Sequence, residues 1–67
     1  MMVIRVNGEP RDTAQGTTIA GLLESLALRP DRVAVELNRA IVKQHLWAET
    51  VLPPGAELEI VQFVGGG

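Results

Sequence analysis

The sequence contains no cysteine, and this absence removes several kinds of chemistry at once. A thiol nucleophile, a persulfide on a side chain, a disulfide and a thiolate metal cluster are all excluded. A chain of 67 residues forms one small domain at most, because it buries only about 60% of its unfolded surface on folding. The hydrophobic core must therefore stabilise the fold alone, and any sulfur chemistry must use another atom.

Long apolar runs are also missing. The longest run is residues 1–4, which is far shorter than the about 20 residues of a membrane-spanning helix or the roughly seven of a signal-peptide core. We therefore expect a cytoplasmic protein with no membrane partner. The net charge of −2 comes from six cations and eight carboxylates without a basic cluster, so we expect no nucleic-acid partner either.

The usual motifs for phosphate loops, dinucleotide sites and metal sites are absent too. We therefore expect the chain to bind no nucleotide, cofactor or metal by itself. His45 is the only histidine, and nothing in the sequence predicts that it converges with Ser25, Asp12 or Asp31 into a triad. We interpret His45 as a solvated loop residue and predict no catalytic residue.

What is present indicates a folded β-rich start. Nearly a third of the residues are Leu, Ile, Val or Phe, which is above the level typical of disordered chains. The strand-forming residues 2–6 precede Asn7-Gly8, a dipeptide that readily adopts the two positive φ values of a tight hairpin turn. The return strand is expected at residues 9–12, and Pro10, which has no N–H for a ladder, places that strand at a sheet edge.

A helix follows the hairpin. From Thr17 or Thr18 onward, apolar residues recur with helical spacing, at Ile19, Leu22, Leu23 and Leu26. We expect a threonine to cap this helix and Pro30 to end the segment. Gly21 costs about 1 kcal/mol relative to alanine inside a helix, and we attribute its presence to close packing against the sheet.

The second half of the chain contains three further strands. Alternating apolar residues predict a strand at residues 32–37, and Asn38-Arg39 then turns the chain into a short strand at residues 40–42. Residues 43–52 have no clean period, and we expect four apolar side chains to pin this irregular crossover onto the core, namely Leu46, Trp47, Val51 and Leu52. After a turn at residues 53–55, a last strand at residues 57–61 places Leu58 and Ile60 inward and two glutamates outward.

This order of elements predicts an α+β fold of the β-grasp type. A mixed sheet of four to five strands would carry one main helix on one face, with the first and last strands parallel at the centre. The C-terminus would then leave from the middle of the sheet. We assign residues 1–64 to this domain and residues 65–67 to a flexible glycine tail.

The tail itself suggests chemistry. Three glycines form the slimmest chain available and can thread a narrow channel. At Gly67 a terminal carboxylate would be ionised at neutral pH, because the ordinary pKa of an α-carboxyl lies far below 7. It could attack the α-phosphate of ATP held by another protein, and a sulfur donor could convert the acyl adenylate to a thiocarboxylate without any cysteine. A frayed terminus or a cloning remnant is the competing interpretation.

Strand parity adds a second hint. Because Leu58 and Ile60 face the core, Val61 and Phe63 fall on the opposite face, next to the tail. Two apolar side chains there are candidate docking residues. The alternative is that Phe63 folds back onto the body of the domain.

Taken together, these motifs resemble the ThiS family, the ubiquitin-like β-grasp sulfur carriers of thiamine biosynthesis. The resemblance covers essentially the whole chain. It rests on Asn7-Gly8, residues 18–23, residues 33–38 followed by Ile41-Val42, Trp47, the Pro-Gly turn and the closing residues 63–67. Two departures concern Gly55-Ala56, where the family often has Gly-Asp, and Lys43-Gln44, where it often has an arginine. Neither departure touches the tail.

The resemblance implies a role and partners. Gly67 would be adenylated by an ATP-using ThiF-type enzyme, converted to a thiocarboxylate with a cysteine-derived sulfur donor, and presented to thiazole synthase. The chain would be a co-substrate and not an enzyme. Gly65 and Gly66 would thread into the partner's active site, while Val61, Phe63 and Val64 would dock the partner.

Three alternatives remain open at this point. The same carrier chemistry could serve the molybdenum cofactor (molybdopterin) or tRNA thiolation, because the glycine tail alone does not name the acceptor. A ubiquitin-like conjugation tag would instead form an isopeptide bond with a lysine. In a plain binding module, the glycines would be incidental.

Overall fold

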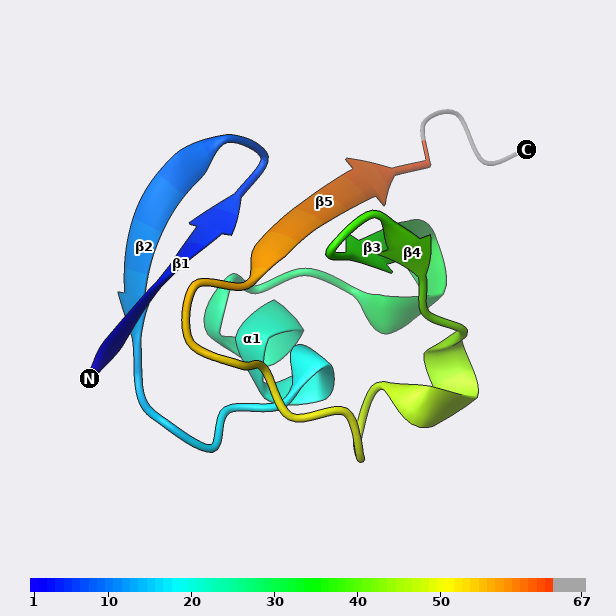
Figure 1. The fold of residues 1–67 in the computed structure, drawn as a ribbon. Helices are drawn as coiled ribbons and strands as arrows, with labels where there is room; N and C mark the ends of the chain where they lie inside the picture. The colour runs from blue at the N-terminus through cyan, green and yellow to red at the C-terminus, as the bar shows by residue number, and fades with distance from the viewer. Residues whose placement is uncertain (64–67) are drawn as a thin grey trace.

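The computed structural model describes residues 1–63, which form a five-stranded mixed sheet packed on one helix (Figure 1). The sheet order is β2-β1-β5-β3-β4, with bounds β1 Met2–Val6, β2 Glu9–Thr13, β3 Val33–Leu37, β4 Ala40–Ile41 and β5 Glu57–Gln62. Helix α1 spans Ile19–Ser25, and two 3₁₀ turns, η1 and η2, span Pro30–Arg32 and Gln44–Leu46. β1 and β5 are parallel neighbours at the centre, so the predicted β-grasp arrangement is confirmed. The predicted boundary between residues 64 and 65 lies outside the described residues.

Both hairpins turn through left-handed backbone, as the sequence predicts for the first of them. Asn7 and Gly8 have φ values of 52° and 84°, and Asn38 and Arg39 have values of 50° and 71°. Two consecutive positive φ values match the twist of the flanking strands in a tight hairpin. Pro10 lies on β2, an outer strand of the sheet, opposite Arg5, so its missing N–H interrupts no inner ladder.

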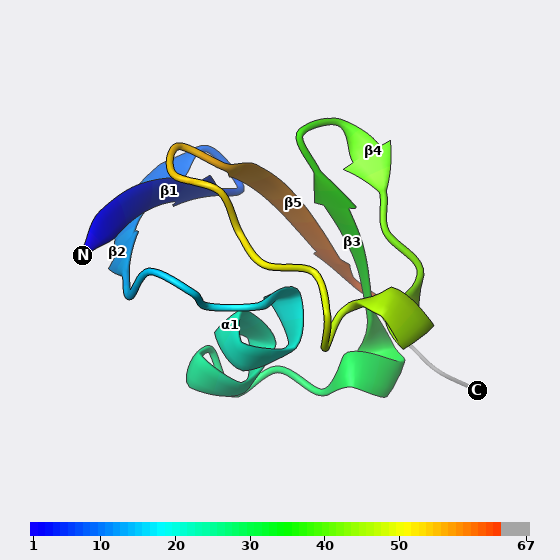
Figure 2. The ribbon, with the colours of Figure 1, turned by 60° about the horizontal axis from the view of Figure 1, so that its bottom comes forward.

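Helix α1 lies against one face of the sheet (Figure 2). It begins at the N-cap Thr18, whose Oγ1 accepts a hydrogen bond of 3.1 Å from the Gly21 backbone N–H. This bond satisfies one of the amides that a helix start leaves without a partner. The predicted apolar stripe is buried at Ile19, Leu22 and Leu23, so α1 covers the inner face of the sheet.

The end of α1 differs from the prediction, because the helix stops before Pro30. The Ala27 N–H bonds to the Glu24 carbonyl and the Leu28 N–H to the Leu23 carbonyl, both at 3.0 Å. Ala27 is left-handed with φ 58°, and this pattern is a Schellman ending. Glycine usually occupies that left-handed position, so the alanine hid the ending from sequence analysis. Pro30 instead begins the 3₁₀ turn η1.

The explanation given for Gly21 was also wrong. A Cβ built at Gly21 would meet Thr18 Oγ1 at 3.4 Å and Thr17 Cγ2 at 3.7 Å, with no sheet atom within 4 Å. These are ordinary van der Waals distances. Gly21 therefore lies at the start of the helix with room for a methyl group, and the sheet does not require it to be glycine.

Replacing Gly21 with alanine should stabilise the protein. The methyl group fits, and alanine loses less backbone entropy on folding, so the free energy of unfolding should rise by about 0.5–1 kcal/mol. Urea denaturation measures the change. Gly16→Ala is the control, because Gly16 has φ +88° and a side chain there should cost about 1 kcal/mol instead. A destabilised Gly21→Ala variant would contradict this account.

The crossover between β4 and β5 is irregular, as predicted, but only two of its four apolar side chains are buried. Trp47 and Leu52 are 3% and 2% exposed, whereas Leu46 and Val51 are 37% and 55% exposed. Trp47 Nε1 donates a 2.7 Å hydrogen bond to the Val42 carbonyl, which fixes the ring in the core. Val51 forms an isolated bridge with Thr18, and this extended backbone turns neighbouring side chains to opposite sides. The expectation for Leu46 and Val51 is therefore wrong.

The core lies between the inner face of the sheet, α1 and the crossover. Among residues 1–63 it contains only apolar side chains, and no buried side-chain nitrogen or oxygen lacks a hydrogen-bond partner. Within the same residues, no helix has the length and apolar character needed to cross a membrane. A small core of apolar side chains depends strongly on close packing for its stability.

Candidate functional site

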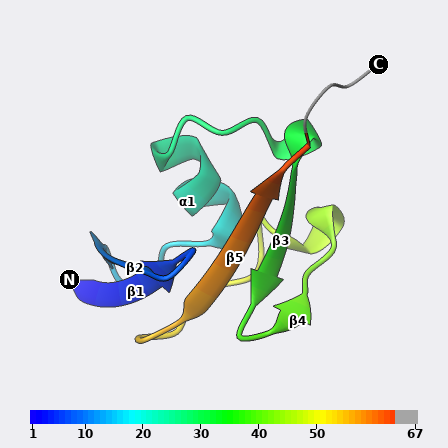
Figure 3. The ribbon, with the colours of Figure 1, turned by 90° about the horizontal axis from the view of Figure 1, so that it is seen from above.

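The candidate site is the end of β5, from which the chain runs into the glycine tail. β5 lies third in the five-stranded order, parallel to β1 on one side and antiparallel to β3 on the other (Figure 3). Its pairing with β3 continues to the end of the described chain, where the Phe63 N–H donates to the Arg32 carbonyl at 2.8 Å. The described part of the chain therefore ends on a paired strand in the middle of the sheet, where the sequence predicts that the C-terminus leaves.

The two faces of β5 carry different side chains. Leu58 and Ile60 are 1% and 8% exposed and face the core, whereas Val61 and Phe63 are 58% and 55% exposed. Phe63 is therefore not buried against the body of the domain, so the alternative that it folds back onto the domain is wrong. On the outer face Val61 lies opposite the exposed Ala34 of β3. We call Ala34, Val61 and Phe63 the exit patch.

Charged residues border the exit patch on the same face. Glu59 lies directly opposite Glu36 of β3, and Glu57 lies opposite Arg5 of β1. The only ion pair among residues 1–63 joins Arg29 to Asp31 at 3.1 Å, and both of these side chains are exposed. The apolar exit patch thus continues into a polar surface along β5, as at the rim of a docking surface.

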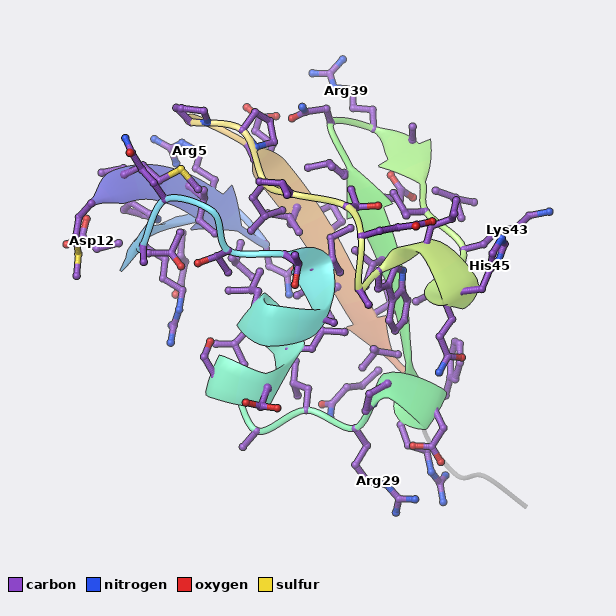
Figure 4. The ribbon with its side chains drawn as sticks, turned by 90° about the horizontal axis from the view of Figure 1, so that it is seen from below. Arg5, Asp12, Arg29, Arg39, Lys43 and His45 are labelled. Carbon is purple, nitrogen blue, oxygen red and sulfur yellow. The ribbon has the colours of Figure 1, made fainter. Side chains whose placement is uncertain are left out.

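The described residues offer no enclosed site for catalysis. No pocket forms within residues 1–63, and no group of three or more His, Asp or Glu side chains there could hold a metal ion. His45 is exposed on η2, and Asp12 lies at the opposite side of the molecule (Figure 4). Ser25 Oγ donates to the Leu22 carbonyl within its own helix, and Asp31 pairs with Arg29. The structure thus brings none of these residues together with His45.

The labelled cations are also scattered. Figure 4 shows Arg29, Arg39 and Lys43 pointing outward at separate places, while Arg5 lies apart from them and its Nη1 donates to the Gly8 carbonyl at 3.0 Å. These four cations do not form a continuous basic stripe of the kind that binds a phosphate backbone.

Part of the predicted site lies beyond the structure. Val64, Gly65, Gly66 and Gly67 fall outside the described residues. Their predicted roles in docking, threading and modification therefore remain predictions, while Val61 and Phe63 have the exposure that docking requires.

Sequence analysis missed a role for the turn asparagines. The Asn7 side chain forms two hydrogen bonds with Ile60 of β5, and Asn38 Oδ1 accepts one from the Glu57 N–H. The sequence pattern predicts both asparagines only as turn formers. The signal in the sequence was an asparagine at each left-handed turn position, since a short amide side chain there can bond to nearby backbone.

The fold and the exit patch can now be compared with known proteins. The model of the ThiS family matches residues 4–67, which is nearly the whole chain. The chain belongs to the ThiS family. This match includes β5 and the glycine tail, so the family resemblance inferred from the motifs is confirmed.

Relatives of two lengths are similar to this chain. The sulfur carrier protein ThiS of Escherichia coli is 32% identical over 98% of this chain and 100% of its own length. Proteins named thiazole synthase from Magnetococcus marinus and Paramagnetospirillum magneticum are 44% and 39% identical over 98% of this chain. The chain spans about a fifth of the length of these thiazole synthases.

A solved structure supports the same assignment. The thiamine biosynthesis protein ThiS from Geobacter metallireducens superposes with a TM-score of 0.85 at 30% identity, covering 98% of this chain and all of that one. The ThiS fold is therefore shared along its whole length. Together, the family match, the E. coli relative and this structure agree on membership of the ThiS family and on the ThiS fold.

Proposed function

We propose that this chain carries sulfur for thiazole formation as a thiocarboxylate at Gly67. The observation that carries the proposal is the ThiS-family match, which extends to Gly67. The whole-length similarity to the E. coli sulfur carrier protein supports it. The absence of cysteine from the chain agrees with a carrier whose sulfur is held on the backbone carboxyl.

The proposed activation has two steps. The Gly67 carboxylate attacks the α-phosphorus of ATP in a ThiF-type enzyme, pyrophosphate leaves, and an acyl adenylate forms. Hydrosulfide released from a cysteine-derived donor then attacks the acyl carbon, and AMP leaves with the former carboxylate oxygen, so that a thiocarboxylate replaces the carboxylate. ATP belongs to the partner's site, and this chain supplies the reacting carboxyl without a cofactor of its own.

Delivery of the carboxyl depends on the tail and on the exit patch. Gly65 and Gly66 have no side chains to obstruct a narrow channel, so we assign them to threading. Val61, Phe63 and Val64 dock the partner. The exposure of Val61 and Phe63 at the end of β5 supports this assignment, since exposed apolar side chains beside a functional segment are typical of interaction surfaces.

We further propose thiazole synthase as the acceptor partner. Two proteins of that name contain a region 44% and 39% identical to nearly all of this chain. The presence of such a region within proteins of that name supports a functional contact between this chain and thiazole synthase. In this role the protein is a co-substrate that is modified and regenerated, not a catalyst.

The docking assignment predicts a measurable loss in a Val61→Ser variant. Removing an apolar contact worth about 1–1.5 kcal/mol should raise the KM for the carrier roughly five- to tenfold. Carrier-dependent ATP–pyrophosphate exchange by a ThiF-type enzyme measures this KM.

A matched control for this variant is Val3→Ser. Val3 is 54% exposed, but its carbonyl bonds to Gly55 at the opposite end of β5, so it lies away from the exit patch. Val3→Ser should leave the KM within twofold of wild type. Equal KM values for Val61→Ser and wild type would remove Val61 from the docking surface.

A further inference from the structure

The Asn7 side chain supplies two hydrogen bonds to β5 at a position where β1 no longer pairs with it. Its Oδ1 accepts a hydrogen bond of 2.7 Å from the Ile60 N–H, and its Nδ2 donates one of 3.1 Å to the Ile60 carbonyl. An amide side chain has one acceptor and a donor in the arrangement of a peptide group. Asn7 therefore offers β5 the two bonds that a neighbouring strand would have supplied.

The need for this substitute follows from the topology. β1 pairs with β5 only at Arg5–Glu57 and Val6–Leu58, and the Asn7 N–H adds one bond of 2.8 Å to the Leu58 carbonyl. The backbone then turns away, because Asn7 is left-handed with φ 52°. Without the side chain, both backbone groups of Ile60 would lose these partners, and each unpaired, desolvated group is costly.

The position of the two bonds connects them to the exit patch. Ile60 immediately precedes Val61, and it is the last residue at which β5 is bonded to the β1 side among residues 1–63. Beyond it, the bonds run only to the β3 side, as at Phe63 and Arg32. Asn7 thus holds β5 at the point where the inward Ile60 gives way to the outward Val61.

We propose that Asn7 is a positioning residue that fixes the end of β5 for partner docking. The proposal rests on the proposed sulfur-carrier function and adds a residue to it that touches neither the partner nor the reacting carboxyl. When the Asn7 side chain bonds to Ile60, Val61 and Phe63 lie on an ordered strand. When these bonds are lost, the partner must order that strand on binding, which weakens binding without affecting chemistry in the bound complex.

The test uses Asn7→Gly, with Asn38→Gly as its matched control. Glycine adopts both left-handed turn conformations without strain, so each variant keeps its turn and loses only side-chain bonds. Asn38 has φ 50°, and its Oδ1 bonds to the Glu57 N–H at 3.0 Å, at the start of β5 and away from the exit patch. A second variant, Asn7→Asp, keeps the acceptor for the Ile60 N–H and loses the donor.

Two measurements are made on each variant. Amide hydrogen exchange of the free protein should be about tenfold faster at Ile60 in Asn7→Gly and unchanged there in Asn38→Gly. In the ATP–pyrophosphate exchange assay, Asn7→Gly should raise the KM for the carrier about fivefold with kcat unchanged. Asn38→Gly should stay within twofold of wild type, and Asn7→Asp should fall between wild type and Asn7→Gly.

The possible results separate this inference from the proposed function. Equal KM increases for Asn7→Gly and Asn38→Gly would show that Asn7 is merely structural and would overturn the positioning role. If the amide hydrogen exchange rate at Ile60 were unchanged in Asn7→Gly, the two Asn7–Ile60 hydrogen bonds would not hold β5 in place. If the wild-type chain were not activated at all, the sulfur-carrier proposal would fail, and the docking role of Asn7 would fail with it, whatever the exchange data showed.

Discussion

Deletion of Gly67 should reduce carrier-dependent adenylation by at least a hundredfold. The shortened chain still ends in a glycine carboxylate, but an extended residue spans about 3.5 Å, so the carboxylate falls short of the α-phosphorus. A misplacement of about 1 Å can already cost a hundredfold in rate. ATP–pyrophosphate exchange with a ThiF-type enzyme measures the loss.

The same deletion should leave the fold unchanged. Among residues 1–63, every buried core residue lies between Met2 and Ile60, so the free energy of unfolding should match that of the full chain within about 0.5 kcal/mol. Gly67→Ala is the companion variant, because it keeps the length and the carboxylate and adds only a methyl group. It should be less impaired than the deletion. Wild-type activation of the shortened chain would show that the reach of the tail is not limiting.

Leu58→Ala should have the largest effect on stability. Leu58 is 1% exposed on the central strand, with Val6 and Leu37 beside it on the neighbouring strands. Removing a buried leucine side chain typically costs about 2–5 kcal/mol, whereas a chain of this length has a total stability of only about 3–10 kcal/mol. Urea denaturation followed by circular dichroism should show a variant near or below its folding threshold at 37 °C.

Glu59→Ala is the control on the same strand. Glu59 is exposed, and it lies opposite another glutamate, Glu36. Like charges at directly opposed positions destabilise a sheet slightly, so the variant should match or slightly exceed wild-type stability. A loss of less than 1 kcal/mol in Leu58→Ala would contradict the assignment of β5 as the centre of the core.

Much of the fold could be predicted from local patterns. Alternation in residues 57–61 correctly separated the buried Leu58 and Ile60 from the exposed Val61. Asn7-Gly8 marked the first turn, and Pro10 correctly placed β2 at an edge. These predictions succeeded because each rests on a constraint that belongs to the residue itself or to its immediate neighbours.

The predictions that failed depended on tertiary context. Ala27 ends α1 in a left-handed conformation that alanine rarely adopts, and Leu28, which is packed against the core, follows it. Such packing can stabilise an unfavourable backbone conformation, and a single sequence does not reveal it. The burial of Trp47 beside an exposed Leu46 likewise depends on the crossover geometry, because no regular period orders those residues.

The candidate site was predictable in part for the same reason. Strand parity placed Val61 and Phe63 on the outer face, but the link between Asn7 and Ile60 spans 53 positions along the chain. Long-range hydrogen bonds of this kind leave no local pattern in one sequence. The motifs that identified the family lie in the hairpins, the helix and the tail, and the family match confirms them together.

Fragmentation mass spectrometry of the intact wild-type chain tests the central claim most directly. The chain is incubated with a ThiF-type enzyme, ATP and a cysteine-derived sulfur source, and then sequenced in the gas phase. We predict a gain equal to the mass difference between one sulfur and one oxygen atom, located on Gly67 alone. No gain, a gain on any other residue, or a heavier adduct joined through an isopeptide bond would contradict the sulfur-carrier account.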